Sequence, residues 1–135
     1  MESEGQAAHI NTFGLGDTGR YRTNVWDYPG ISSLGAIRDE ERAMHPTVKP
    51  VEMVADAIRD CSRRGGVILD AFSGSGTTIM AAEQTGRRAR AIELDPRYVD
   101  VAVRRWQKAT GGTATLAGSG TTFDDLAALV EDLEA

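Results

Sequence analysis

Apolar residues recur at helical spacing, and in one continuous run, through the middle of the chain. The first pattern predicts an amphipathic helix that stops before Gly65, and its apolar positions are Val51, Val54, Ile58 and Cys61. Thr47 suits the N-cap of this helix, and Pro50 suits its first turn. The continuous run from Val67 to Leu69 is typical of a parallel strand that is buried on both faces.

Predicted helices and strands continue to alternate beyond this strand. An alanine-rich helix is predicted from about Thr77 to Thr85, where Gly86 would end it, and a second strand from Ala89 to Glu93. Pro96 then opens a helix with an apolar stripe that ends before Gly111. The order helix, strand, helix, strand, helix predicts an α/β fold with a parallel sheet flanked by helices and right-handed crossovers.

Both ends of the chain differ from this central part. Residues 1–22 are polar and glycine-rich and predict an irregular N-terminal segment, after which 23–28 could form a short strand. We expect one domain over residues 23–111, followed by a linker of small residues over 112–122. Residues 123–135 form an acidic amphipathic tail, for which we predict a short helix that docks in a groove on this domain or on a partner.

Charge is concentrated at the C-terminus. The chain of 135 residues has a formal net charge of −5, and its last 17 residues hold five acids and no base. The rest is therefore neutral, which neither supports nor excludes a nucleic-acid partner. No apolar run approaches the roughly 18 residues that cross a bilayer, and acids occupy the N-terminus where a secretory signal is basic. We expect a soluble cytoplasmic protein with no membrane partner.

Cysteine and histidine are scarce. Cys61 is the one cysteine, so the chain has no internal disulfide, and we expect this thiol to be buried on the apolar face of its helix. The two histidines, His9 and His45, are far apart in the sequence, which disfavours a zinc site. No metal is predicted.

A glycine turn from Asp70 to Thr78 connects the first predicted strand to the next helix, where a backbone can approach a nucleotide-like ligand. No lysine follows Gly76, and Ile79 stands at the third glycine of the dinucleotide fingerprint, so phosphate binding is disfavoured. Such a turn can also serve packing alone. Glu93 follows Asp70 by 23 residues, close to the spacing at which a carboxylate reaches a ribose diol. This spacing favours a ribose-binding role over the alternative, an exposed acid at a strand end.

Three segments in this order resemble the N4-cytosine and N6-adenine DNA methyltransferases over about residues 24–111: His45 to Pro50, Asp70 to Thr77, and Glu93 to Asp95. The resemblance implies part of a Rossmann-like methyltransferase fold and S-adenosyl-L-methionine as cofactor. The implied cofactor-binding residues are Thr47, Lys49, Asp70, Phe72, Ser73, Gly74, Ser75, Gly76, Thr77, Glu93 and Asp95. Thr47 and Lys49 would face the methionine end of the cofactor, where Lys49 can neutralise the methionine carboxylate. The alternative is that Lys49 is a solvated lysine at a helix end with no ligand.

The family's catalytic motif, a polar residue followed by Pro-Pro and an aromatic, is missing, and no Pro-Pro pair occurs in the chain. Asp95-Pro96-Arg97-Tyr98 resembles that motif, but it lies at the ribose-binding position and Pro96 is better explained as a helix opener. We therefore assign no catalytic residue. A partner polypeptide that supplies the catalytic half, or self-association, would complete the sheet, and DNA would bind to the complete enzyme.

Two other functions stay open from the sequence. The chain could be a non-catalytic module for cofactor binding or assembly, or part of a methyltransferase that acts on RNA or a small molecule, because the turn alone does not identify the acceptor. The His45 to Pro50 segment favours DNA, by resemblance.

Overall fold

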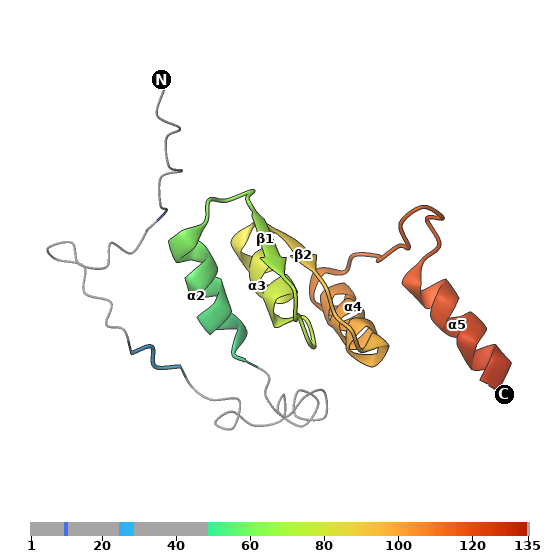
Figure 1. The fold of residues 1–135 in the computed structure, drawn as a ribbon. Helices are drawn as coiled ribbons and strands as arrows, with labels where there is room; N and C mark the ends of the chain where they lie inside the picture. Colours follow the sequence, from blue (N-terminus) through green and yellow to red (C-terminus); the bar gives the residue numbers. More distant parts are fainter. Residues whose placement is uncertain (1–9, 11–24, 29–48, 135) are drawn as a thin grey trace, which may run out of the picture.

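The computed structural model describes residue 10, residues 25–28 and residues 49–134 (Figure 1). The elements follow one another as α2 (Val51–Cys61), β1 (Val67–Asp70), α3 (Thr77–Thr85), β2 (Arg88–Ala91), α4 (Pro96–Thr110) and α5 (Phe123–Glu134). The predicted alternation of helices and strands is therefore confirmed, and the fold is α/β. No described helix is both long and apolar enough to span a membrane.

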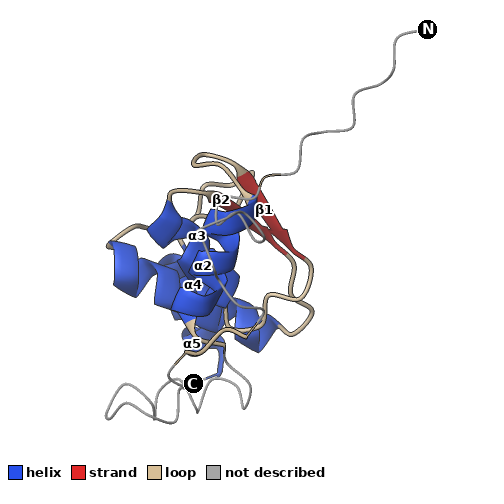
Figure 2. Ribbon diagram, turned by 90° about the vertical axis from the view of Figure 1, so that its left-hand side faces the viewer, coloured by secondary structure: helices blue, strands red, loops and turns tan. Residues whose placement is uncertain are grey.

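The sheet is formed by β1 and β2, which run parallel with Val67 opposite Arg88 and Asp70 opposite Ala91. Helix α3 is the crossover between the two strands, and Gly86 ends it in a left-handed conformation, with φ of 70°. Figure 2 shows the helices gathered on one side of the two strands. The second strand ends at Ala91, so Glu93 lies just beyond it and not within it as predicted.

The core lies between the sheet and the first two helices. Small side chains let α2 and α3 approach each other closely, and the buried members are Ala55, Ile58, Ala81 and Ala82. Ile68 of β1 and Ala89 of β2 pack against them from the sheet. One face of the sheet is thus covered by helices.

The prediction that β1 is buried on both faces is wrong for the described part of the chain. Val67 is 54% exposed and Leu69 is 72% exposed, because the helices cover the face to which Ile68 belongs. An apolar run predicts burial, but the sequence does not say which segment provides the covering layer.

Two local predictions around α2 also need correction. Pro50 is the N-cap and not part of the first turn, and the proposed N-cap Thr47 lies outside the described residues. Cys61 is exposed and not buried, because it is the last residue of the helix; its Sγ donates to the carbonyl of Ala57 at 2.9 Å.

The predicted strand over 23–28 is absent where the structure describes this segment, at residues 25–28. Instead, the hydroxyl of Tyr28 donates to Asp56 on α2 at 2.5 Å, and the ring of Tyr28 meets that of Trp26 edge to face. These contacts place residues 25–28 beside α2.

The segment predicted as a linker folds back on itself before α5. Thr115 pairs with Thr122 in an antiparallel bridge, and the Thr122 hydroxyl accepts a hydrogen bond from the Asp125 N–H in the first turn of α5. The guanidinium of Arg104 on α4 lies 5.2 Å from the centre of the Phe123 ring. Helix α5 therefore contacts α4 at its first turn, and the helix predicted for the acidic tail is present.

Candidate functional site

The turn after β1 is held at the ends of both strands by backbone and side-chain hydrogen bonds. The Ser73 N–H donates to the carbonyl of Ile92 at 3.1 Å, so the turn after β1 is tied to the end of β2. Asp70 accepts from the Phe72 N–H at 3.0 Å and from the Thr78 hydroxyl at 2.5 Å. Asp70 thus links the end of β1 to the first turn of α3 and fixes the loop between them.

The two glycines of this turn serve different purposes. Gly76 has φ of 83°, and a Cβ there would lie 2.7 Å from the Cβ of Ala102, so Gly76 allows α3 and α4 to pack closely. Gly74 has φ of 53°, and a Cβ there would meet nothing within 4 Å. Gly74 therefore lies where the backbone is open to a ligand, whereas Gly76 is a packing glycine.

The second half of the turn faces α4. Ser75 is buried at 4% exposure, and Arg105 donates to its carbonyl at 2.8 Å and to its hydroxyl at 3.2 Å. Thr77 is also buried at the start of α3. Three of the residues predicted to bind a cofactor are therefore packed inside the domain: Ser75, Gly76 and Thr77. No local sequence pattern indicates the role of Arg105, because it lies 30 residues from Ser75.

The carboxylate of Glu93 is joined directly to the glycine turn. Its Oε2 accepts from the Gly74 N–H at 2.7 Å, and its Oε1 accepts from the N–H groups of Leu94 and Asp95 at 2.9 and 3.0 Å. The hydrogen bonds from Asp95 and Gly74 lower the pKa of Glu93 below its ordinary value. A carboxylate has about four acceptor positions, so Oε2 retains room for one further donor.

Asp95 has a structural role at the start of α4. Its Oδ1 accepts from the Arg97 N–H at 3.0 Å as the N-cap, and the Arg97 guanidinium binds both of its oxygens. The side-chain hydrogen bond from Arg97 is the main cause that lowers the pKa of Asp95. Pro96 is the first residue of α4, which confirms its interpretation as a helix opener.

Two large apolar side chains that are close to the glycine turn and to Glu93 in the sequence are almost fully exposed. Phe72 is 91% exposed and Leu94 is 96% exposed, although both are large apolar residues. Phe72 belongs to the turn and Leu94 follows Glu93 directly, so the two side chains come from the two ends of the strands. Sequence reasoning missed Leu94, because a lone leucine beside an acid has no distinguishing spacing.

Lys49 precedes the first turn of α2 and is exposed. In Figure 1 this turn lies at the same end of the domain as the loop that follows β1, because α2 and β1 run in opposite directions. Thr47, which was predicted beside it, lies outside the described residues. The structure thus brings together Asp70, Phe72, Ser73, Gly74, Glu93 and Asp95 and places Lys49 at the same end.

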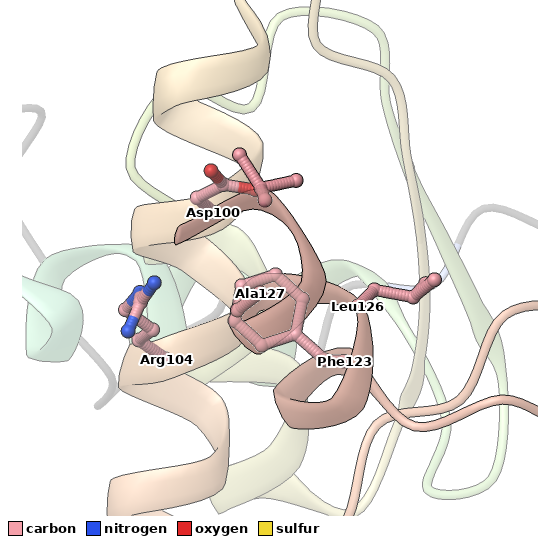
Figure 3. A pocket seen from close by; sticks show the side chains of 6 residues that line it. Asp100, Arg104, Phe123, Leu126 and Ala127 are labelled. Atoms are coloured by element: carbon pink, nitrogen blue, oxygen red, sulfur yellow. The ribbon is translucent and has the colours of Figure 1, made fainter. Parts of the chain in front are cut away.

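A cavity of about 300 Å³ lies elsewhere, between α4 and α5 (Figure 3). Phe123, Leu126, Ala127 and Val130 form its apolar wall, and Asp100 and Arg104 form its polar one. None of the residues predicted to bind a cofactor lines this cavity. The predicted site is instead an open surface at the carboxyl ends of β1 and β2, the usual place for ligands in parallel α/β sheets.

A family model for the DNA methylases of N6 and N4 type matches residues 3–104. This range covers the glycine turn, Glu93 and the first part of α4, and it amounts to most of the chain. The chain therefore belongs to this DNA methylase family, as the three sequence segments indicated.

Individual relatives agree with this assignment. The type II methyltransferase M.ScaI of Streptomyces caespitosus is 40% identical over 87 residues, which are 64% of this chain and 29% of M.ScaI. The DNA adenine methyltransferase YhdJ of Escherichia coli is 37% identical over 82 residues, 61% of this chain and 26% of YhdJ. The chain thus spans less than a third of these relatives. Among solved structures, the complex of M1.HpyAVI with S-adenosylmethionine shares 32% identity at a TM-score of 0.46, over 48% of this chain and 32% of M1.HpyAVI.

Proposed function

We propose that this chain is the S-adenosylmethionine-binding part of a DNA amino-group methyltransferase that acts on adenine N6 or cytosine N4. The observation that carries the proposal is the 2.7 Å hydrogen bond from the Gly74 N–H to Glu93. It joins an open glycine turn to a carboxylate at the adjacent strand end, and these are the two groups that an adenosine-like ligand requires.

The residues at this surface suit the proposed cofactor. The position of Gly74 leaves the backbone unobstructed, Glu93 keeps an acceptor position for a ribose hydroxyl, and the exposed Phe72 offers an aromatic face to an adenine. Lys49 would balance the carboxylate of the methionine end, since it is exposed at the same end of the domain. When bound, the cofactor supplies a methyl group on a sulfonium centre.

Several of the predicted residues would support the shape of the site and would not contact the cofactor themselves. Asp70 and Asp95 hold the two ends of the site through Thr78 and Arg97, while Ser75, Gly76 and Thr77 pack against α4. The rigid turn that they form would keep the Gly74 backbone and the Glu93 carboxylate in a fixed relation to the cofactor.

We also propose that methyl transfer requires a second portion of polypeptide. The sequence has no Pro-Pro-aromatic motif, which in this family would hold the amino group of a flipped base.

Titration calorimetry with S-adenosylmethionine tests the proposal. We expect micromolar-to-millimolar affinity for the wild-type chain and an affinity about ten- to a hundredfold lower for Glu93→Ala, because a charge-assisted hydrogen bond to the ribose is lost. The matched control is Glu83→Ala on α3, whose carboxylate also accepts a hydrogen bond from another element, from Trp106 at 3.1 Å.

Glu83→Ala should leave the affinity unchanged. Glu93 also holds the glycine turn through its hydrogen bond with the Gly74 N–H. Circular dichroism must therefore show that Glu93→Ala is folded at the temperature of the titration. No binding by the wild-type chain, or equal affinities for Glu93→Ala and the wild type, would contradict the proposed function.

A further inference from the structure

Helix α5 is held to the domain at its N-terminal end. Besides the ring contact of its first residue with α4, the amide of Gln107 on α4 donates to Asp124 at 3.1 Å. The helix then stands apart from α2, α3 and the two strands (Figure 1). Leu129 is 58% exposed and Leu133 is 86% exposed. The described residues therefore leave the apolar side of the second half of α5 uncovered, although a helix of this length depends on packing for its stability.

Three leucines of α5 share one side of the helix. Leu126, Leu129 and Leu133 follow one another at steps of three and four residues, the spacing at which one helix packs along another. We call these three residues the α5 leucine stripe. Leu126 also lines the cavity between α4 and α5, together with Val130, which is 55% exposed (Figure 3). The stripe and the cavity therefore form one apolar surface that can receive the side chains of an added helix.

Acidic residues border the α5 leucine stripe. Asp125 precedes Leu129 by four residues and Asp132 follows it by three, so both lie beside the stripe, and both are exposed. The last 17 residues of the chain hold five acids and no base. On the α4 side, the guanidinium of Arg104 already lies against the ring of Phe123. A helix that covers the stripe would therefore meet carboxylates along its border.

From this surface we infer that the α5 leucine stripe and the adjoining cavity bind an amphipathic helix of a partner protein, whose apolar side is flanked by lysine or arginine. Apolar side chains of the partner would cover the stripe, and its basic groups would pair with the border carboxylates. A second copy of α5 fits less well, because it would bring acids against acids. The family model matches residues 3–104, so α5 lies outside the matched range, and the inference does not rest on the proposed function.

Fluorescence anisotropy with labelled peptides and the full chain tests the inference. The probe is a peptide of about 14 residues, or four helical turns, with leucines along one side and lysines beside them. One control peptide has glutamates in place of the lysines, and the other has the same composition with its leucines spread around the helix. We expect micromolar affinity for the lysine peptide, which falls as salt is added, and at least about tenfold weaker binding of both controls.

Variants of the chain test where the peptide binds. Leu133→Ser should weaken the lysine peptide about tenfold, because the buried apolar area at the stripe is lost. Leu69→Ser is the matched control, since Leu69 is a leucine of β1 that is 72% exposed, and it should bind like the wild type. Asp132→Asn should weaken binding about two- to fivefold at low salt, because one surface ion pair is lost. Circular dichroism and melting curves check that the variants stay folded.

Several results would overturn the inference. They are absence of binding by the lysine peptide, equal affinities for the three peptides, and equal affinities for Leu133→Ser and Leu69→Ser. Light scattering without peptide is a further check, because a dimer that Leu133→Ser abolishes would assign the stripe to a second copy of the chain. If Leu133→Ser loses helix, the three peptides with the wild-type chain still decide. All measurements are made without S-adenosylmethionine, so their outcome is independent of cofactor binding.

Discussion

Glu93 is the residue on which both the turn and the proposed site depend. Three backbone N–H groups converge on its carboxylate, and they lower its pKa in the folded state. A carboxyl group with a lowered pKa in the folded state stabilises the fold fully above its ordinary pKa, and this contribution is lost as the pH falls through the lowered value.

This predicts a pH-dependent difference between the wild type and Glu93→Gln. The wild type should be more stable at about pH 7. The difference should shrink as the pH falls below the ordinary pKa of a glutamate and through the lowered pKa of Glu93 in the folded state. Urea unfolding across this range measures it. Asp95 is present in both proteins, so its own lowered pKa cancels. A difference that stays constant with pH would show that the ionised carboxylate does not stabilise the turn.

Part of this residue-level arrangement was predictable. A carboxylate at the tip of the second strand, near the glycine turn, followed from spacing alone, and the structure joins the two by a hydrogen bond. The contacts of Arg105 with Ser75 and of Arg97 with Asp95 were not predicted, because they depend on where α4 packs and how its first turn is capped.

At the level of elements, the glycine turn combines one open position and one packed position. Gly74→Ala forces a left-handed alanine, which costs about 1–2 kcal/mol, and Gly76→Ala adds a clash with Ala102 worth about 1–3 kcal/mol more. We therefore expect Gly76→Ala to lower the free energy of unfolding more than Gly74→Ala does. Cofactor affinity should be reduced for Gly74→Ala even where that variant is folded, because its methyl group projects toward the open side.

Chemical denaturation and calorimetry of the two variants test this order. Equal losses of stability would contradict the distinction between the two glycines.

The boundaries of the helices could be predicted from glycine and proline. Gly86 and Gly111 end α3 and α4, and Pro96 begins α4, as the sequence indicated. The exposure of Val67 and Leu69 could not be predicted from the sequence. Whether a strand face is buried depends on which other segment packs against it, and the residues of the strand do not determine that.

At the level of the whole molecule, the described residues form a small α/β domain. Its proposed cofactor surface is open, and Val67 and Leu69 are exposed on the face of the sheet that the helices do not cover. Its hydrophobic core rests on small residues such as Ala55 and Ala81, and no large side chain is fully buried among the described residues. The family was predictable because three motifs occur in order, and the family model confirms it. The share of its relatives that the chain spans, 23–29%, could not be predicted from the sequence alone.

The most direct test of the central claim is a crystal structure of this chain with S-adenosylmethionine. We predict the cofactor over the Gly74 backbone, with a ribose hydroxyl within about 3.2 Å of the Glu93 carboxylate. Cofactor bound in the cavity between α4 and α5, or ribose hydroxyls without contact to Glu93, would contradict the account.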